Sequence, residues 1–408
     1  MDRVSGSRRV VRGIGVAVGA LIIVAAGVYT PLVLSVDIPP TAPRVLAVEQ
    51  AADMAPVALP ESGSSAVRLN GSVLAEAGDA APRPIAGAAK VVTALVVLDA
   101  FPLDPGAAGP SIPIGAAEDQ RFRQMRDELG YRTVPVVAGQ FWTQRETLQA
   151  ALLSSSNNHA EMLAIWAFGG VDQYLAKARA WLDEHGFADI TVIDPTGISP
   201  ENLGTAPDLV RLTEQAFADP TLAEITQGSS VRTTSGTHVE NTTAYLADEG
   251  VTALSRSYTD ASAITLLFAL TVPIGEGTVV LYGTILGSPS YPTLEKDLAA
   301  LVESAVQNIT EQPLLTKGDT VAVYETEWGD TAKVVAAESV STVGWTGAAI
   351  DAEVTLEPIG PARANTRVGS AVYQLASGEQ TVRLVLETAL DAPDPLWLLT
   401  HPMALSDD

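Results

Sequence analysis

The spacing of hydrophobic residues changes along this chain and divides it into segments. No charged residue occurs between positions 13 and 36. In the middle of the chain hydrophobic residues recur at helical spacing, followed by strand-like runs at 264–272 and 278–282. From about residue 312 onward apolar and polar residues alternate, most clearly over 350–357. The pattern predicts an apolar N-terminal segment, a mixed α/β domain and an all-β domain.

The apolar N-terminal segment follows a basic stretch that contains four arginines within residues 1–12. It exceeds the roughly 20 residues that a helix needs to cross a bilayer, and no small-x-small cleavage pattern ends it. Because basic residues precede it and an acidic chain follows, residues 1–36 predict a single-pass anchor in the cell membrane. The N-terminus would lie in the cytoplasm and the folded domains outside it. A cleaved signal peptide is the alternative.

The segment that follows, residues 37–64, is rich in proline and alanine and lacks periodicity, which is typical of a spacer. Structure is expected to begin near Ser65, and Asn70-Gly71 between two short runs predicts a β-hairpin. Helices between flanking strands make residues 65–309 a mixed α/β domain with a largely antiparallel sheet. Residues 310–408 are predicted to form a smaller all-β domain.

The amino-acid composition limits which kinds of ligand and partner the protein is expected to bind. The 408 residues include 48 acidic and 24 basic side chains, a formal net charge of -24, and nucleic acid binding is therefore not expected. The chain has no cysteine, which excludes disulfides, thiolate metal sites and a cysteine nucleophile. Its 4 histidines are scattered without ligand spacing, so no metal or other cofactor is predicted. His159 is expected on a helix surface.

One candidate site lies at the start of a helix, residues 91–100, that is apolar nearly all round and therefore predicted to be buried. Lys90 stands at its beginning, in a setting of small residues. A serine one helical turn earlier would complete S-x-x-K, in which a hydroxyl nucleophile lies beside an amine that takes its proton. Residue 87 is glycine. The lysine of the S-x-x-K motif is thus present, but its serine nucleophile is missing.

A second cluster of polar residues follows a helix that Thr143 and Glu146 are expected to begin as a capping box. Its residues are Ser154-Ser155-Ser156-Asn157-Asn158, and another helix is predicted after them. Ser155 and Asn157 have the spacing of an S-x-N motif. A structural role for these two residues as helix caps is equally compatible with the sequence.

Together with these motifs, two further blocks resemble the serine-type D-alanyl-D-alanine carboxypeptidases, the low-molecular-mass penicillin-binding proteins. The blocks are Asp194-Pro195-Thr196-Gly197-Ile198 and Thr205-Ala206-Pro207-Asp208-Leu209, similar to D-x-T-G-L and T-A-x-D-L. The resemblance covers about residues 65–308. It implies an α/β (α+β) fold, that is, a penicillin-binding/β-lactamase-like transpeptidase domain with an antiparallel sheet and a helical subdomain, followed by the all-β domain.

The resemblance also implies acyl transfer on the peptidoglycan stem peptide, with a serine attacking the bond between two D-alanines. It assigns proton transfer to Lys90 and Ser155 and substrate orientation to Asn157. A K-T-G strand should bind the substrate carboxylate just before Tyr258-Thr259-Asp260. A gap-free alignment puts Ser255-Arg256-Ser257 there, whereas one deletion lets Arg256-Ser257 stand for Lys-Thr. Ser255, Arg256, Ser257 and Thr259 are therefore the candidate substrate-binding residues.

The absence of a hydroxyl at Gly87 decides the functional prediction, because removing a serine nucleophile lowers turnover by about a million-fold. The main hypothesis is an envelope carboxypeptidase homologue that has lost acylation but still binds stem peptides or an envelope protein partner. One alternative is an active carboxypeptidase that uses another serine, with Ser155 as the candidate. Another is a purely structural or interaction protein. Lys90 as a buried amine without function, and Arg256 as a solvated surface residue, are the corresponding structural interpretations.

Overall fold

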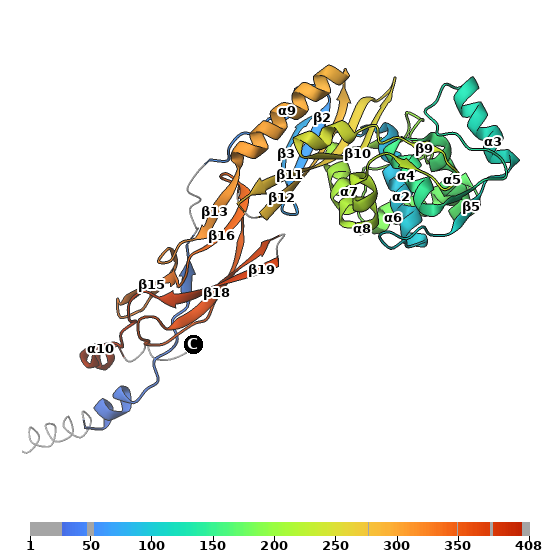
Figure 1. Ribbon diagram of the computed structural model, residues 1–408. Coiled ribbons are helices and arrows are strands. Elements are labelled where there is room, and N and C mark those ends of the chain that lie inside the picture. The colour runs from blue at the N-terminus through green and yellow to red at the C-terminus, as the bar shows by residue number, and fades with distance from the viewer. Residues whose placement is uncertain (1–26, 47–52, 276, 349, 376–377, 402–408) are drawn as a thin grey trace, which may run out of the picture. The chain divides into compact units, whose positions relative to one another are not determined.

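The computed structural model describes residues 27–46, 53–275, 277–348, 350–375 and 378–401 (Figure 1). Within these ranges the chain forms two compact units. The larger unit comprises Ala52–Gln312 and Val343–Ala348, and the smaller comprises Met1–Ala51, Pro313–Thr342 and Ala349–Asp408. The predicted division at residues 64/65 and 309/310 remains a prediction. All the candidate site residues belong to the larger unit.

The structure contradicts the predicted membrane anchor in residues 1–36. No helix among the described residues is both long and apolar enough to cross a bilayer. In this part of the chain the described helical residues are 27–34. Residues 13–26 of the predicted span lie outside the described residues.

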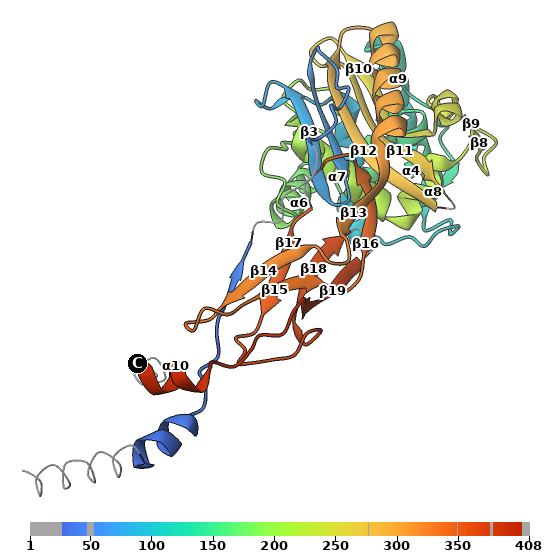
Figure 2. The same ribbon diagram turned by 90° about the vertical axis from the view of Figure 1, so that its left-hand side faces the viewer.

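A five-stranded antiparallel sheet in the order β10-β11-β12-β2-β3 forms the centre of the larger unit (Figure 2). Its strands are β2 (Ser64–Leu69), β3 (Ser72–Gly78), β10 (Val251–Thr259), β11 (Ala263–Ile274) and β12 (Gly277–Ser288). The predicted hairpin at Asn70-Gly71 joins β2 to β3. Both turn residues have positive φ, +51° and +79°, as the tight turn of a two-residue hairpin requires. The first and last parts of this domain's sequence thus meet in one sheet.

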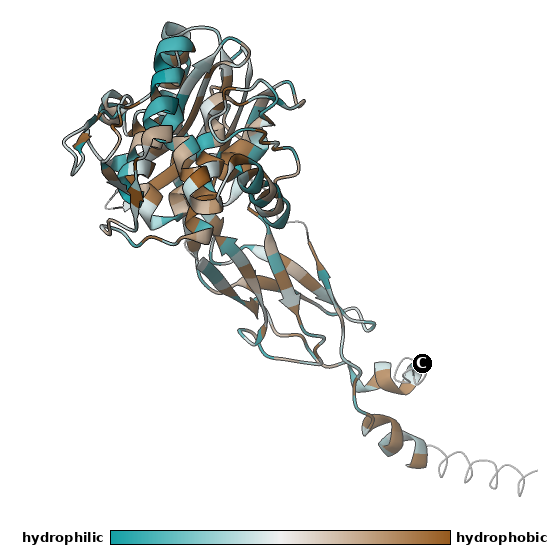
Figure 3. Ribbon diagram, turned by 90° about the vertical axis from the view of Figure 1, so that its right-hand side faces the viewer, coloured by the Kyte–Doolittle hydropathy of each residue, from teal (hydrophilic) through white to brown (hydrophobic). Residues whose placement is uncertain are grey.

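Helices cover both faces of this sheet. One face carries a helical cluster that shares a core with it, and α9 (Tyr291–Asn308) packs on the other face with a separate core (Figure 1). The main helices of the cluster are α2 (Ala89–Ala100), α4 (Gln144–Leu153), α5 (Asn157–Phe168), α6 (Val171–Glu184), α7 (Ala206–Ala218) and α8 (Pro220–Gln227). In Figure 3 the hydrophobic segments gather inside this unit.

Short elements complete the larger unit. The short helices are η1 (Ala86–Ala88, one turn), α3 (Ala116–Arg123), the π-helical turn η2 (Gln124–Glu128) and the 3-10 helix η3 (Ala244–Glu249). Three pairs of short strands accompany them: β4 (Arg83–Pro84) with β7 (Leu203–Gly204), β5 (Ser111–Pro113) with β6 (Phe141–Thr143), and β8 (Val231–Arg232) with β9 (His238–Val239). Thr143 and Glu146 form the predicted capping box of α4, and Thr205 caps α7 by accepting from the backbone N–H of Asp208. These caps satisfy orphan N–H groups at the helix starts.

The smaller unit is built on a six-stranded antiparallel sheet in the order β1-β14-β15-β19-β18-β17. Its strands are β1 (Pro43–Val45), β14 (Thr320–Glu325), β15 (Thr331–Ala336), β17 (Ala352–Leu356), β18 (Arg367–Leu375) and β19 (Gly378–Leu386), and the short helix α10 (Pro395–Thr400) follows. A second pair, β13 (Ile309–Leu315) and β16 (Val340–Trp345), has residues in both units. The predicted fold class, a mixed α/β domain with an antiparallel sheet followed by a strand-rich region, is confirmed.

Candidate active site

The helix that begins the candidate site is buried as its sequence predicts. Each residue of η1 and all of α2 up to Leu98 are buried. Gly87 lies in the middle of η1, and its backbone N–H donates to the Ser257 hydroxyl at 2.8 Å. Lys90 follows in the first turn of α2 and is only 5% exposed. The nucleophile position therefore lies directly opposite β10.

Burial sets the charge state of Lys90. Loss of hydration lowers its pKa to about 7; the carboxylate of Asp194 raises the pKa and the positive charge of Arg132 lowers it. Its Nζ donates to the Thr196 carbonyl oxygen at 2.6 Å. An amine with a pKa close to neutral can accept a proton from a hydroxyl group. Lys90 can therefore accept and release a proton near neutral pH.

The loop that holds Lys90 is organised by Asp194. Its two carboxylate oxygens accept hydrogen bonds from the backbone N–H groups of residues 196, 197 and 199 and from the side chains of Thr196 and Asn202. Burial raises the Asp194 pKa, but these hydrogen bonds lower it more, and the net pKa falls below its usual value. Gly197 has φ +78°, and a Cβ there would overlap the Ala86 carbonyl oxygen. Glycine is thus required where this loop meets η1.

The S-x-N residues lie between α4 and α5. Ser155 has φ +48°, a conformation that is uncommon outside glycine and concentrates at functional sites. Among the described residues its hydroxyl has no hydrogen-bond partner. Asn157 donates from its side chain to the Arg132 carbonyl oxygen at 3.0 Å, while its own Oδ1 is buried with no partner within the described ranges. Both residues keep unused hydrogen-bonding capacity.

His159 is completely buried rather than on the helix surface as the sequence suggested. Its Nδ1 lies 2.8 Å from the Ser156 hydroxyl, and its ring packs on Trp142 with centroids 4.4 Å apart. Burial lowers its pKa to about 3, so the ring is neutral at physiological pH. His159 supports the turn that contains Ser155 and Ser156.

The strand β10 presents alternate residues to opposite faces. Ser257 faces η1, as its hydrogen bond with Gly87 requires, and Ser255 shares that face and is buried. Thr259, at the end of the strand, is bonded to the Ser262 hydroxyl at 2.8 Å and closes the turn toward β11. Only Ser257 among these candidate residues directly contacts the nucleophile position.

Arg256 points to the other face of the sheet. Its guanidinium lies over the rings of Tyr245 and Tyr291, 5.3 and 5.1 Å from their centroids. It also donates to the Tyr245 hydroxyl at 2.7 Å and to the Thr242 carbonyl oxygen at 3.0 Å. Tyr291 begins α9, which packs on the face away from the helical cluster. Arg256 is therefore packed on the face of the sheet that carries α9.

A cation that sequence reasoning missed, Arg132, lies on the helical side of the site. Its backbone carbonyl accepts from both the N–H and the side chain of Asn157, and its charge acts on Lys90. Its side chain is exposed and forms no hydrogen bond or ion pair with any described residue. In the sequence Arg132 lies outside the motifs that marked the site, so no pattern pointed to it.

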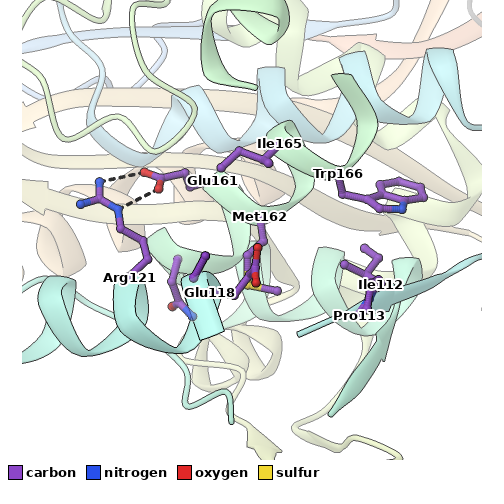
Figure 4. A pocket seen from close by; sticks show the side chains of 10 residues that line it. Ile112, Pro113, Glu118, Arg121, Glu161, Met162, Ile165 and Trp166 are labelled. Carbon is purple, nitrogen blue, oxygen red and sulfur yellow. Dashed lines mark hydrogen bonds and ion pairs between the residues drawn. The ribbon is translucent and has the colours of Figure 1, made fainter. Parts of the chain in front are cut away.

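A separate cavity of about 390 Å³ lies beside α5 (Figure 4). Arg121 donates to both carboxylate oxygens of Glu161 at its edge, at 2.7 and 2.9 Å. The cavity is lined by Ile112, Pro113, Ala117, Glu118, Arg121, Asn158, Glu161, Met162, Ile165 and Trp166. None of the predicted site residues lines it. Within the described ranges no three His, Asp or Glu side chains gather where a metal ion could be held.

The candidate site thus lies where the helical cluster on one face of an antiparallel sheet meets its edge strand β10. The profile of the D-alanyl-D-alanine carboxypeptidases matches residues 66–273, just over half of the 408 residues. The chain belongs to this family. The predicted resemblance is confirmed.

Individual relatives agree with this assignment. A D-alanyl-D-alanine endopeptidase of Pseudomonas aeruginosa is 32% identical over 35% of this chain and 42% of its own length. A D-alanyl-D-alanine carboxypeptidase structure from Mycobacterium tuberculosis is 26% identical, with a TM-score of 0.51, and the match covers 62% of this chain and 95% of that one.

Penicillin binding protein 5 of Haemophilus influenzae shares the fold at 15% identity, with a TM-score of 0.58 over 84% of this chain and all of that one. The curated relatives are longer than the region they share with this chain. The chain spans half or less of the length of each of those it matches.

Proposed function

We propose that this protein binds peptidoglycan stem peptides ending in D-alanyl-D-alanine and does not form an acyl-enzyme. One observation carries the proposal: Lys90, Ser155 and Asn157 are buried, and the Asn157 Oδ1 has no partner among the described residues, while Gly87 has no side chain. The family membership supplies the ligand class.

The missing hydroxyl argues against turnover. Loss of a serine nucleophile lowers turnover by about a million-fold, or roughly 8 kcal/mol of barrier. Lys90 still has the pKa of a proton acceptor, but at residue 87 no hydroxyl proton is present for it to take. A neighbouring hydroxyl would have to reach the substrate carbonyl from a different direction.

Three groups support peptide binding. The Asn157 Oδ1 is a buried acceptor without a partner in the described part of the chain, and an unpaired buried acceptor is costly unless a ligand donates to it. The Ser155 hydroxyl is likewise unpaired there. Arg132 offers an exposed guanidinium for the terminal carboxylate of the peptide, whereas Arg256 is stacked on Tyr291 of α9. The predicted envelope protein partner remains a prediction.

Calorimetric titration of the full chain tests the proposal. The ligands are a stem pentapeptide ending in D-Ala-D-Ala and the same peptide ending in L-Ala-L-Ala, and released D-alanine is measured in parallel. We expect binding of the first peptide only and no release of D-alanine. We expect Arg132→Gln to weaken binding about tenfold, because it removes one charged hydrogen-bonding partner.

Two results contradict the proposal in different ways. Release of D-alanine at an ordinary enzymatic rate means that another group performs the attack. Equal or absent binding of the two peptides means that the site has no specificity for the stem peptide.

A further inference from the structure

Ser257 occupies the space that a side chain at residue 87 would need. A Cβ placed on Gly87 lies 2.8 Å from the Cβ of Ser257 and 2.9 Å from its Oγ. Ordinary contacts between carbon atoms are about 3.5–4.0 Å. The same Cβ would lie 3.4 Å from the Ser155 Oγ, which is an acceptable contact. The obstacle comes from β10 and not from the S-x-N turn.

The two close contacts differ in how easily they are relieved. The Ser257 hydroxyl can rotate away, but its Cβ is fixed to the backbone of β10, where Ser257 is paired with Thr265 of β11. Moving this carbon means moving the strand. A residue without Cβ at either position removes the overlap at once.

The Ser257 hydroxyl also accepts the hydrogen bond of the Gly87 N–H at 2.8 Å. A backbone N–H at the residue that attacks a carbonyl is well placed to stabilise the negative oxygen that develops. Here this donor is already occupied by a side chain of the protein. Ser257 thus occupies the space beside residue 87 and accepts the hydrogen bond that its backbone N–H donates.

We propose that Ser257 is a blocking residue and that positions 87 and 257 are interlocked, so that only one of them can carry a side chain. This inference rests on the proposed function, since it explains why the site does not acylate. It assigns the loss of acylation to two positions, and restoring a serine at residue 87 alone recovers the reaction only in part.

The test uses the full chain in four forms: wild type, Gly87→Ser, Ser257→Gly and the double variant. Each is incubated with a fluorescent penicillin, and covalent labelling is followed by gel fluorescence and intact mass. In the restored reaction the new hydroxyl oxygen bonds to the β-lactam carbonyl carbon and the carbon–nitrogen bond of the ring breaks. The hydroxyl proton passes through Lys90 to the ring nitrogen, so the whole penicillin stays attached.

We expect labelling of the double variant, at least about tenfold slower labelling of Gly87→Ser, and none of the other two forms. Gly87→Ser with Ser257→Ala is the matched control: it removes the hydroxyl at 257 and keeps its Cβ, and we expect it to stay close to Gly87→Ser alone. Equal labelling rates for Gly87→Ser and the double variant overturn the interlock, and so does a folded double variant that does not label.

Thermal unfolding gives a second readout that does not depend on acylation. We expect Gly87→Ala to lower the Tm by about 3 °C or more in the wild-type background and clearly less in the Ser257→Gly background. Additive shifts overturn the interlock. Labelling of the wild type is a separate result, because it contradicts the proposed absence of acylation, and peptide mapping then identifies the serine that reacted.

Discussion

The two sides of the candidate site differ in how their polar groups are used. On the helix side, Lys90, Ser155 and Asn157 are buried, and the Oδ1 of Asn157 has no partner among the described residues. On the strand side, the terminal guanidinium nitrogens of Arg256 are bonded within the protein, while its Nε is buried without a described partner. Arg256 is packed between two tyrosines and the Ser257 hydroxyl accepts from Gly87.

We propose that ligand binding and acylation depend on different groups of this fold. In the proposed function Ser155, Asn157 and Arg132 hold the peptide. Attack on a carbonyl additionally needs a hydroxyl at residue 87 and a free backbone N–H there. The glycine at residue 87 supplies no hydroxyl, and its N–H is already bonded to Ser257.

The largest expected effect concerns the loop on the helix side. Gly197→Ala places a Cβ onto the Ala86 carbonyl oxygen at a positive φ, and we expect the free energy of unfolding to fall by more than about 3 kcal/mol. Gly236→Ala is the control, because it has a similar φ of +86° and nothing within 4 Å; we expect about 1 kcal/mol there. Equal losses in urea unfolding would show that the loop is not tightly packed on η1.

The next effect concerns the charge of Lys90. Below about pH 7 it is protonated in both the folded and the unfolded protein; between pH 7 and 10.5 only the unfolded protein keeps the proton. Raising the pH through this range therefore stabilises the fold. We expect the stability of the wild type relative to Lys90→Met to rise by roughly 3 kcal/mol from pH 7 to 10. Urea unfolding at several pH values measures it.

An exposed lysine provides the control for the pH experiment. Lys177→Met removes a lysine from the surface of α6. A rise of the same size relative to this variant would contradict the role given to burial at Lys90.

A smaller effect tests the strand side. Arg256→Lys keeps the positive charge but loses the planar contact with the two tyrosines. We expect a loss of about 1 kcal/mol in stability, with stem-peptide affinity unchanged within about twofold. Titration calorimetry and thermal unfolding of the same preparation separate the two outcomes. A large loss of affinity at unchanged stability would mean that Arg256 contacts the ligand.

The smallest effect concerns the backbone of Ser155. With φ +48°, Ser155→Gly relieves an unfavourable conformation, whereas Ser155→Ala removes the same hydroxyl and keeps the conformation. We expect the glycine variant to be more stable than the alanine variant by about 0.5–1 kcal/mol. Peptide affinity should fall equally in both. If alanine is the more stable, the positive φ stores no strain at the site.

Local signals in the sequence predicted much of this structure. The capping box of α4, the Asn70-Gly71 turn and the buried α2 each depend on residues close together in the chain. The S-x-N residues and the Asp194 block were located by their resemblance to motifs of the family. A helix cap or a tight turn requires particular residue types at adjacent positions, so a pattern of a few residues is enough to predict it.

The orientation of Arg256 could not be predicted. A register shift between Ala253 and Ser255 interrupts the alternation of β10, so the faces of the later residues cannot be counted from the earlier ones. Its aromatic partners, Tyr245 and Tyr291, come from elements before and after the strand. The same limitation applies to His159, whose burial depends on Trp142 from another segment, and to Ser257, whose contact lies 170 positions away.

The stacking of Arg256 has a consequence for the conditions under which the site keeps its shape. Its aromatic partners carry no net charge, and the attraction acts over about 5 Å, well inside the Debye length of about 8 Å at physiological ionic strength. The edge of the sheet is therefore held against α9 by a contact that dissolved salt weakens less than it weakens an exposed ion pair.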